Sequence, residues 1–208
     1  MMRAIFAVLL FFSFPLSTFA QDSFQSVEAF LKSTVGAADQ LSAEARGDLN
    51  SDRLEDWVGV IRSAPEDESP TYQLFLLLRM PQGEYRLAEK TQKAEIPGMG
   101  CCWLEDLTIR RGSIYIQNNA KTAATMEAAT HQFKLHKGQW RLVGLRVYLT
   151  DHTPAAPITN DSDMNVLAGL VIQKVQKGES RPVSHRRTKK FPVSYLRDFD
   201  FSNGFGSE

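Results

Sequence analysis

The chain has 208 residues, and its 24 Lys and Arg balance 24 Asp and Glu, so its formal net charge is zero. Such neutrality gives no electrostatic reason to expect a nucleic-acid partner. The two cysteines are too few for the disulfide framework of a small secreted scaffold. A hydrophobic core must therefore supply most of the stability, and the length is sufficient for one.

The first twenty residues have the three parts of a cleavable secretory signal. Arg3 supplies a positive charge, residues 4–14 are largely apolar, and small side chains precede a cleavage point after Ala20. An uncleaved anchor is the alternative, but Pro15 interrupts the apolar run well short of the ~20 residues that span a bilayer. We expect the mature chain, residues 21–208, to be periplasmic or secreted, with no transmembrane span.

One helix followed by strands is predicted at the start of the mature chain. Apolar residues recur every three or four positions over residues 22–35, which indicates a short amphipathic helix. Residues 57–61 and 72–80 are then short apolar runs rich in strand-forming residues. They are separated by residues 65–70, which have the composition of an exposed acidic loop.

Three turn signals follow, each with a glycine between two strand-like arms, at residues 81–83, 111–112 and 137–138. The arms around the last turn alternate apolar and polar side chains over residues 131–135 and 143–149. The sequence therefore predicts three successive hairpins.

The last third of the chain contains fewer strand signals. Residues 151–163 hold prolines and no apolar periodicity, which predicts a loop, and residues 166–175 predict another strand. A basic segment, residues 174–190, then precedes an aromatic tail. The predicted fold class is mainly β, an antiparallel meander sheet of about 8–10 strands with one short N-terminal helix. We expect residues 21–208 to form a single domain whose basic and aromatic tail begins near residue 177.

A short acidic loop is the segment most informative about chemistry. The side chains of Asp48, Asn50, Asp52 and Asp56 carry oxygens at alternate or near-alternate positions, and the backbone carbonyl of Leu54 lies between them. Calcium takes about six to eight oxygen ligands, and this spacing lets a tight loop direct several of them at one ion. These five residues are the predicted calcium ligands.

The same loop carries a resemblance to a known family. Followed directly by the apolar run 57–61, it resembles the calcium loops of FG-GAP and VCBS repeats. Those repeats recur to build a propeller, whereas one clear copy is found here, so the resemblance implies a calcium loop without a propeller. Over residues 45–175 the order of loop, strands and hairpins also resembles small exported bacterial proteins without an assigned activity, which implies architecture more than function.

Two positions depart from these calcium loops. Arg53 stands where a left-handed backbone favours glycine, and Gly59 stands where an EF-hand has a bidentate Glu. The alternative to a metal site is a turn that its own side chains stabilise by hydrogen bonds.

Cys101 and Cys102 are adjacent, and in an oxidising compartment they can join as a vicinal disulfide, which is the predicted pairing. The alternatives are an unreactive reduced pair and a redox or soft-metal pair, although two thiolates supply only half of a zinc shell.

No nucleotide-binding glycine loop, zinc-protease motif or serine-nucleophile elbow occurs, so no catalytic residue is assigned. The sequence favours an exported, non-catalytic binding or structural module with a calcium loop and an envelope protein or glycan as partner. The runner-up is a redox protein or other enzyme centred on the cysteine pair. The basic segment is expected to be solvated, with an acidic partner as the alternative.

Overall fold

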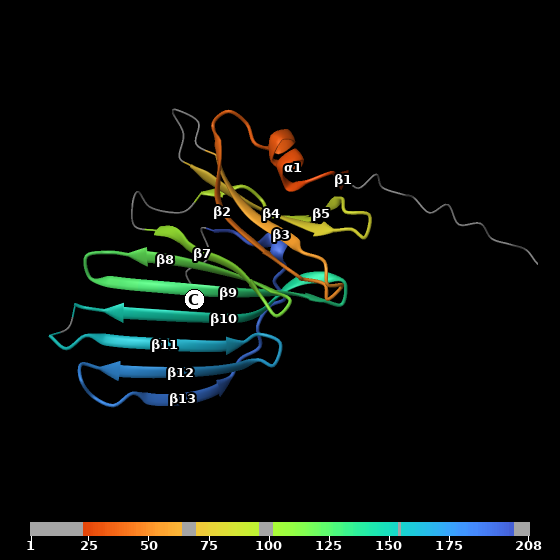
Figure 1. Cartoon of the computed structure of the whole chain (residues 1–208). Coiled ribbons are helices and arrows are strands. Elements are labelled where there is room, and N and C mark those ends of the chain that lie inside the picture. Colours follow the sequence, from red (N-terminus) through yellow and green to blue (C-terminus); the bar gives the residue numbers. More distant parts are fainter. Residues whose placement is uncertain (1–22, 64–69, 96–101, 154, 202–208) are drawn as a thin grey trace, which may run out of the picture.

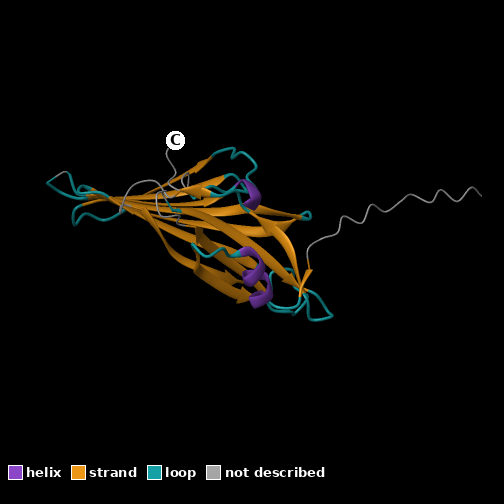
Figure 2. Cartoon of the chain, turned by 90° about the horizontal axis from the view of Figure 1, so that it is seen from above, coloured by secondary structure: helices purple, strands orange, loops and turns teal. Residues whose placement is uncertain are grey.

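A computed structural model of the chain describes residues 23–63, 70–95, 102–153 and 155–201. It is about 61% strand and 7% helical, which confirms the predicted antiparallel β fold with one short α-helix. In a view from above, the helical segments are small beside the strands (Figure 2). The predicted signal segment and almost all of the predicted acidic loop at residues 65–70 lie outside the described residues. Within the described ranges, no helix is long and apolar enough to cross a membrane.

Sheet A has the strand order β1-β5-β4-β3-β2, and β6 pairs with β4. Every pairing in it is antiparallel. Its strands, in chain order, are β1 (Ser23–Phe24), β2 (Asp39–Gly47), β3 (Asp56–Ser63), β4 (Thr71–Arg79), β5 (Tyr85–Lys90) and β6 (Ala94–Glu95).

The helix α1 (Val27–Thr34) lies against one face of sheet A (Figure 1). It begins where the Ser26 side chain accepts a hydrogen bond from the Ala29 backbone N–H at 3.1 Å, which caps the first turn. The buried Phe30 ring then packs edge-on against Trp57 and Phe75 of the sheet. The predicted helix is therefore confirmed, and its apolar stripe is what holds it to the sheet.

Sheet B is a seven-stranded meander in chain order, antiparallel throughout. Its strands are β7 (Cys102–Arg110), β8 (Ser113–Lys121), β9 (Thr125–His136), β10 (Gln139–Asp151), β11 (Ile158–Asn165), β12 (Leu170–Lys177) and β13 (Val183–Thr188). The β7–β8 turn places Arg111 and Gly112 at φ 51° and 69°, and the β9–β10 turn places Lys137 and Gly138 at 52° and 77°. Two consecutive left-handed residues match the twist of a two-residue hairpin, so these two predicted hairpins are confirmed. The third, at residues 81–83, is confirmed in sheet A, where it joins the antiparallel strands β4 and β5.

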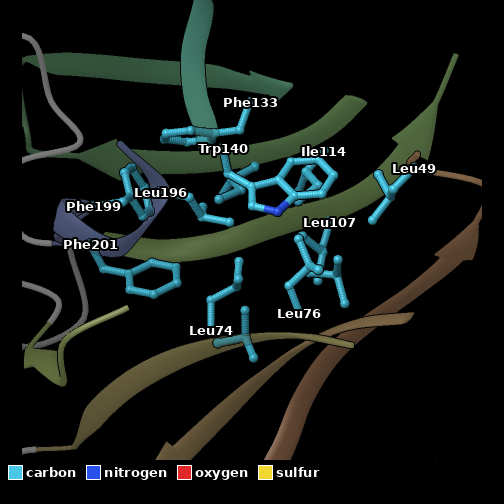
Figure 3. Packing of buried hydrophobic residues seen from close by; sticks show 13 residues of the cluster. Leu49, Leu74, Leu76, Leu107, Ile114, Phe133, Trp140, Leu196, Phe199 and Phe201 are labelled. Carbon is cyan, nitrogen blue, oxygen red and sulfur yellow. The ribbon is translucent and has the colours of Figure 1, made fainter. Parts of the chain in front are cut away.

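The main core lies between sheet A and the first strands of sheet B (Figure 3). The two sheets approach most closely where β2 runs beside β7, as Figure 1 also shows. Six of the eight β3 residues are buried because α1 covers one face of that strand and sheet B the other. The core side chains from the two sheets are Val58, Val60, Leu74, Leu76, Leu107, Ile114, Ile116, Phe133 and Trp140.

The aromatic tail is part of this core. After β13 the chain returns to β10, where the Leu142 N–H donates to the Ser194 carbonyl at 2.9 Å. It then forms the short 3-10 helix η1 (Leu196–Asp198) and inserts Leu196, Phe199 and Phe201 between the sheets. The Phe199 ring lies 5.4 Å from that of Phe133 in sheet B. The side chains of the tail therefore fill the space between the two sheets.

Strands β11–β13, which we call the open half, continue sheet B away from sheet A (Figure 1). Of their residues, only Ser162 and Val171 are buried, and all six β13 residues are exposed. The open half is thus a single layer of sheet.

The prediction of a loop over residues 151–163 is wrong from Ile158 onward, where β11 begins. This strand lacks apolar periodicity because neither face packs on a core; backbone pairing with β10 and β12 holds it instead. The predicted strand at 166–175 begins later, at Leu170, after a turn. Strand β2 was also not predicted, and it too is mostly polar.

Candidate functional site

The predicted calcium loop connects β2 to β3 and is held by its own side chains. The Asp48 carboxylate accepts backbone N–H groups from Ser51 at 2.7 Å, Asp52 at 3.2 Å and Arg53 at 3.0 Å. The Asn50 amide donates to the Asp52 carboxylate at 2.9 Å, and that carboxylate also accepts the Leu54 N–H at 2.8 Å. Asp48, Asn50 and Asp52 therefore converge within one turn.

Asp56 has a different role from the other acidic residues of the loop. Its side chain is fully buried, and its two oxygens accept the Leu49 N–H at 2.8 Å and the Arg79 N–H at 2.9 Å. The first bond holds the loop, and the second holds the end of β4. This carboxylate therefore ties the loop to sheet A, a role that its position in the motif did not indicate.

The acidic groups of the loop influence one another. Burial raises the pKa of Asp56, the two backbone N–H bonds oppose the rise, and the charges of Asp52 and Asp48 add to it. The carboxylates are thus close enough to repel, which is the condition that a cation relieves. Among the described residues, however, no group of three or more His, Cys, Asp or Glu side chains is arranged to hold a metal ion.

The donor set still has capacity for a cation. Asp48 Oδ2, Asn50 Oδ1 and both Asp52 oxygens each accept a single hydrogen bond in this structure. A carboxylate or amide oxygen has two lone pairs, so each of these atoms can accept a second partner. Asp48, Asn50 and Asp52 therefore have lone pairs free for a further partner, whereas Asp56 would have to share oxygens that already bind two backbone groups.

The loop backbone shows the strain that the sequence indicated. Arg53 has φ 67°, in the left-handed region that favours glycine, and Ser51 has φ 68°. The prediction for position 53 is confirmed, and the second left-handed residue was not predicted. Both conformations turn successive N–H groups toward the Asp48 carboxylate.

The cysteine pair lies largely outside the described residues. Cys101 lies outside the described residues, and Cys102 begins β7 with a side chain that is not described. The vicinal disulfide therefore stays a prediction.

His131 is a buried titratable group in sheet B. Its ring makes a hydrogen bond with the Ile116 backbone, stacks edge-on against Phe199 at 5.0 Å, and leaves Nδ1 without a partner among the described residues. Burial lowers its pKa to about 4. The imidazole is therefore neutral at pH 7 and belongs to the core.

The basic segment forms the outer hairpin of the open half, β12 and β13, and the residues that follow. Its cations are Lys174, Lys177, Arg181, Arg186, Arg187, Lys189 and Lys190. In the described part of the chain, none of them lies within 4 Å of a carboxylate.

Comparison with known protein families, characterised proteins and solved structures finds no match for this chain.

Proposed function

We propose that this chain is an exported binding module that takes an extended segment of an envelope protein as an added strand on β13. The observation that carries the proposal is the free edge of sheet B. Strand β13 ends the sheet, no other described strand pairs with its outer side, and all its residues are exposed. Such an edge offers a row of backbone donors and acceptors to a partner strand.

The register identifies which backbone groups face outward. The Lys189 N–H donates to the Gly169 carbonyl at 2.8 Å, in line with the pairing of β13 with β12. Hydrogen-bonded and non-bonded pairs alternate along an antiparallel ladder. Arg187 therefore bonds to β12, whereas Ser184 and Arg186 direct their backbone groups toward solvent.

Charge favours an acidic partner over a second copy of the chain. None of the cations of the hairpin lies within 4 Å of a carboxylate in the described structure, although the charge of Lys174 helps to lower the pKa of Asp161 on β11. Pairing β13 with β13 of another copy would bring Arg186 and Arg187 near their own counterparts, which is unfavourable. An acidic segment would be attracted to the same edge.

The test is a pair of substitutions at one outward-facing position. A photo-crosslinking amino acid at Ser184 should capture an envelope protein in cells. Arg186→Pro removes one outward N–H without breaking the β12 ladder and should abolish the adduct, whereas Arg186→Ala keeps the N–H and should retain it. Circular dichroism establishes that both variants fold.

Three outcomes would overturn strand addition. An adduct that persists in the folded Arg186→Pro variant would show that the backbone edge is not used. An adduct with twice the mass of the chain would identify a second copy as the partner, and one made only with polysaccharide would favour a glycan.

The proposal also assigns a calcium ion to the loop, with Asp48, Asn50, Asp52, the Leu54 carbonyl and Asp56 as its ligands. The support is the repulsion of the Asp56 carboxylate by Asp48 and Asp52, together with the free lone pairs of Asp48, Asn50 and Asp52. The ion would stabilise the β2–β3 connection and would have a structural role, not a catalytic one.

Thermal melting in calcium against a chelator tests this assignment. Extracellular sites bind at about 0.1–1 mM, so 10 mM calcium should stabilise the fold by about 1.4–2.7 kcal/mol, or several degrees. Asp52→Ala should abolish the difference, Arg53→Gly should increase it, and Glu55→Gln, an exposed acidic neighbour, should leave it unchanged. Melting that does not respond to calcium in the parent would leave the loop as a metal-free turn.

A further inference from the structure

A pocket of about 460 Å³ lies at one end of the open half. The turn between β11 and β12, the segment that follows β13, and Arg141 of β10 form its walls. Arg141, Lys189 and Lys190 line it, and no Asp or Glu does. We infer that this pocket binds an organic phosphate, with the phosphate between the three cations and an apolar portion against the wall.

Arg141 is held in place by its backbone. It forms an isolated antiparallel bridge with Tyr195, and the neighbouring Leu142 N–H donates to Ser194 at 2.9 Å. Its Nε is buried and has no hydrogen-bond partner among the described residues. A buried donor without a partner is unfavourable, and a small shift of the side chain toward the pocket would let an oxyanion satisfy it.

The opposite wall is fixed by a close approach of two backbones. Gly169 has φ 64°, and its N-terminal neighbours in the turn are held by a hydrogen bond from the Ala168 N–H to Asn165. A Cβ at Gly169 would lie 2.7 Å from the Lys189 carbonyl oxygen, so only glycine fits without a shift. The Lys189 N–H in turn donates to the Gly169 carbonyl at 2.8 Å. This wall is therefore built into the register of β12 and β13.

The pocket also has an apolar part. Leu167 and Val193 both line it and are 49% and 54% exposed, so together they present apolar surface to the pocket. The Phe191 ring lies beside them, with Lys189 Nζ 5.7 Å from its centre. Inorganic phosphate would leave this surface in water, whereas a ligand with a hydrocarbon or aromatic portion would cover it.

The charge of the pocket favours phosphate over a carboxylate. Three cations surround one space without a counter-charge, so a doubly charged group relieves more repulsion than a singly charged one. The planar guanidinium of Arg141 can donate two parallel hydrogen bonds to phosphate oxygens, and the two lysines add compact charges. The phosphate can belong to a soluble ester or to a lipid headgroup, and the experiment separates these sources.

Isothermal titration of the mature protein with phenyl phosphate tests the inference. We expect binding at least tenfold tighter than that of inorganic phosphate, because only the ester covers the apolar wall. Lys190→Gln should weaken it at least fivefold. Arg181→Gln removes an exposed cation of the same hairpin that does not line the pocket, and it should change the affinity less than twofold.

Arg141→Gln should weaken binding at least tenfold, but it is half-buried, so its fold is checked first by circular dichroism. Sedimentation with phosphatidylglycerol vesicles, against phosphatidylcholine vesicles, then identifies the source. Vesicle binding that Lys190→Gln weakens and Arg181→Gln does not would assign a lipid headgroup, whereas phenyl phosphate binding alone would assign a soluble ester.

Two results would overturn the inference. The first is the absence of phenyl phosphate binding at 10 mM together with vesicle binding that is absent or indifferent to Lys190→Gln. The second is equal weakening by Lys190→Gln and Arg181→Gln, which would show diffuse attraction to a basic hairpin rather than a pocket.

Discussion

Strands β3 and β13 are similar in length but have opposite surroundings. Six of the eight β3 residues are buried, whereas all six β13 residues are exposed. The first lies between α1 and sheet B, and the second ends a single layer. Burial of apolar side chains stabilises β3, whereas β13 depends on the backbone ladder of its neighbours.

The contrast indicates how stability and binding divide within the molecule. The sandwich of sheet A with strands β7–β9 and the tail, which we call the closed half, contains nearly all of the buried apolar side chains. The open half contains the free edge and the cations of the β12–β13 hairpin, none of which lies within 4 Å of a carboxylate in the described part of the chain. Substitutions in the closed half should therefore reduce the stability of the protein. Substitutions in the open half should mainly affect binding.

The sharpest test of this contrast is a pair of large-to-small substitutions. Phe201 is fully buried in the tail, and its ring contacts those of Phe199 and Tyr72. Phe201→Ala should cost about 3–5 kcal/mol, because a cavity forms between the sheets. Val183→Ala on β13, where the side chain is 57% exposed, should cost less than about 0.5 kcal/mol. Urea unfolding measures both, and equal losses would refute the division.

A pH titration tests the closed half through His131. Its pKa is lowered to about 4 in the fold, against about 6.5 when unfolded. Below pH 6.5 the unfolded chain takes up the proton and the folded chain does not, so stability falls from pH 6.5 toward 4. The loss due to this group should be about 2 kcal/mol at pH 5, relative to pH 7.5.

The control for this titration is an exposed histidine. His131→Phe, which keeps an aromatic ring beside Phe199, should flatten the pH dependence, whereas His152→Ala should leave it as in the parent. An unchanged slope in His131→Phe would show that other groups cause the acid sensitivity.

Asp56 tests whether the loop is coupled to the closed half. Asp56→Ala leaves two backbone N–H groups, those of Leu49 and Arg79, without their acceptor. Each such loss costs about 1–3 kcal/mol when buried, so we expect at least about 2 kcal/mol of destabilisation, measured by urea unfolding without calcium. Asp52→Ala, on the exposed side of the loop, should cost less than half as much under the same conditions.

Most of the closed half, apart from the mostly polar β2, could be predicted from the sequence, and much of the open half could not, for one physical reason. Strands such as β3 and β4 can be recognised in the sequence because a buried face requires apolar side chains. The turns at Gly112 and Gly138 can be recognised because they require residues in the left-handed conformation. Strand β11 carries no such pattern, because its side chains need no core. Its backbone can pair only with strands β10 and β12, which must already lie beside it.

The candidate sites follow the same rule. The loop could be found from the spacing of Asp48, Asn50 and Asp52, because its hydrogen bonds join residues that are only a few positions apart in the sequence. The bond from Arg79 to Asp56 and the meeting of Arg141 with Lys190 join positions far apart in the chain. Only the arrangement of the strands brings them together.

The smallest expected effect concerns the one ion pair described within the open half and its neighbour β10. Arg146 binds both Asp161 oxygens at 3.0 Å across the β10–β11 ladder, and this hydrogen bond lowers the pKa of Asp161. Because the Arg146 side chain is 62% exposed, solvent screens the pair, and a double-mutant cycle with Arg146→Ala and Asp161→Ala should give a coupling below about 1 kcal/mol. The lowered pKa means that the coupling is present at neutral pH and is lost as pH falls through the folded pKa of Asp161. A coupling well above that value would show that side chains, and not the backbone ladder, hold β11 in a layer without a core.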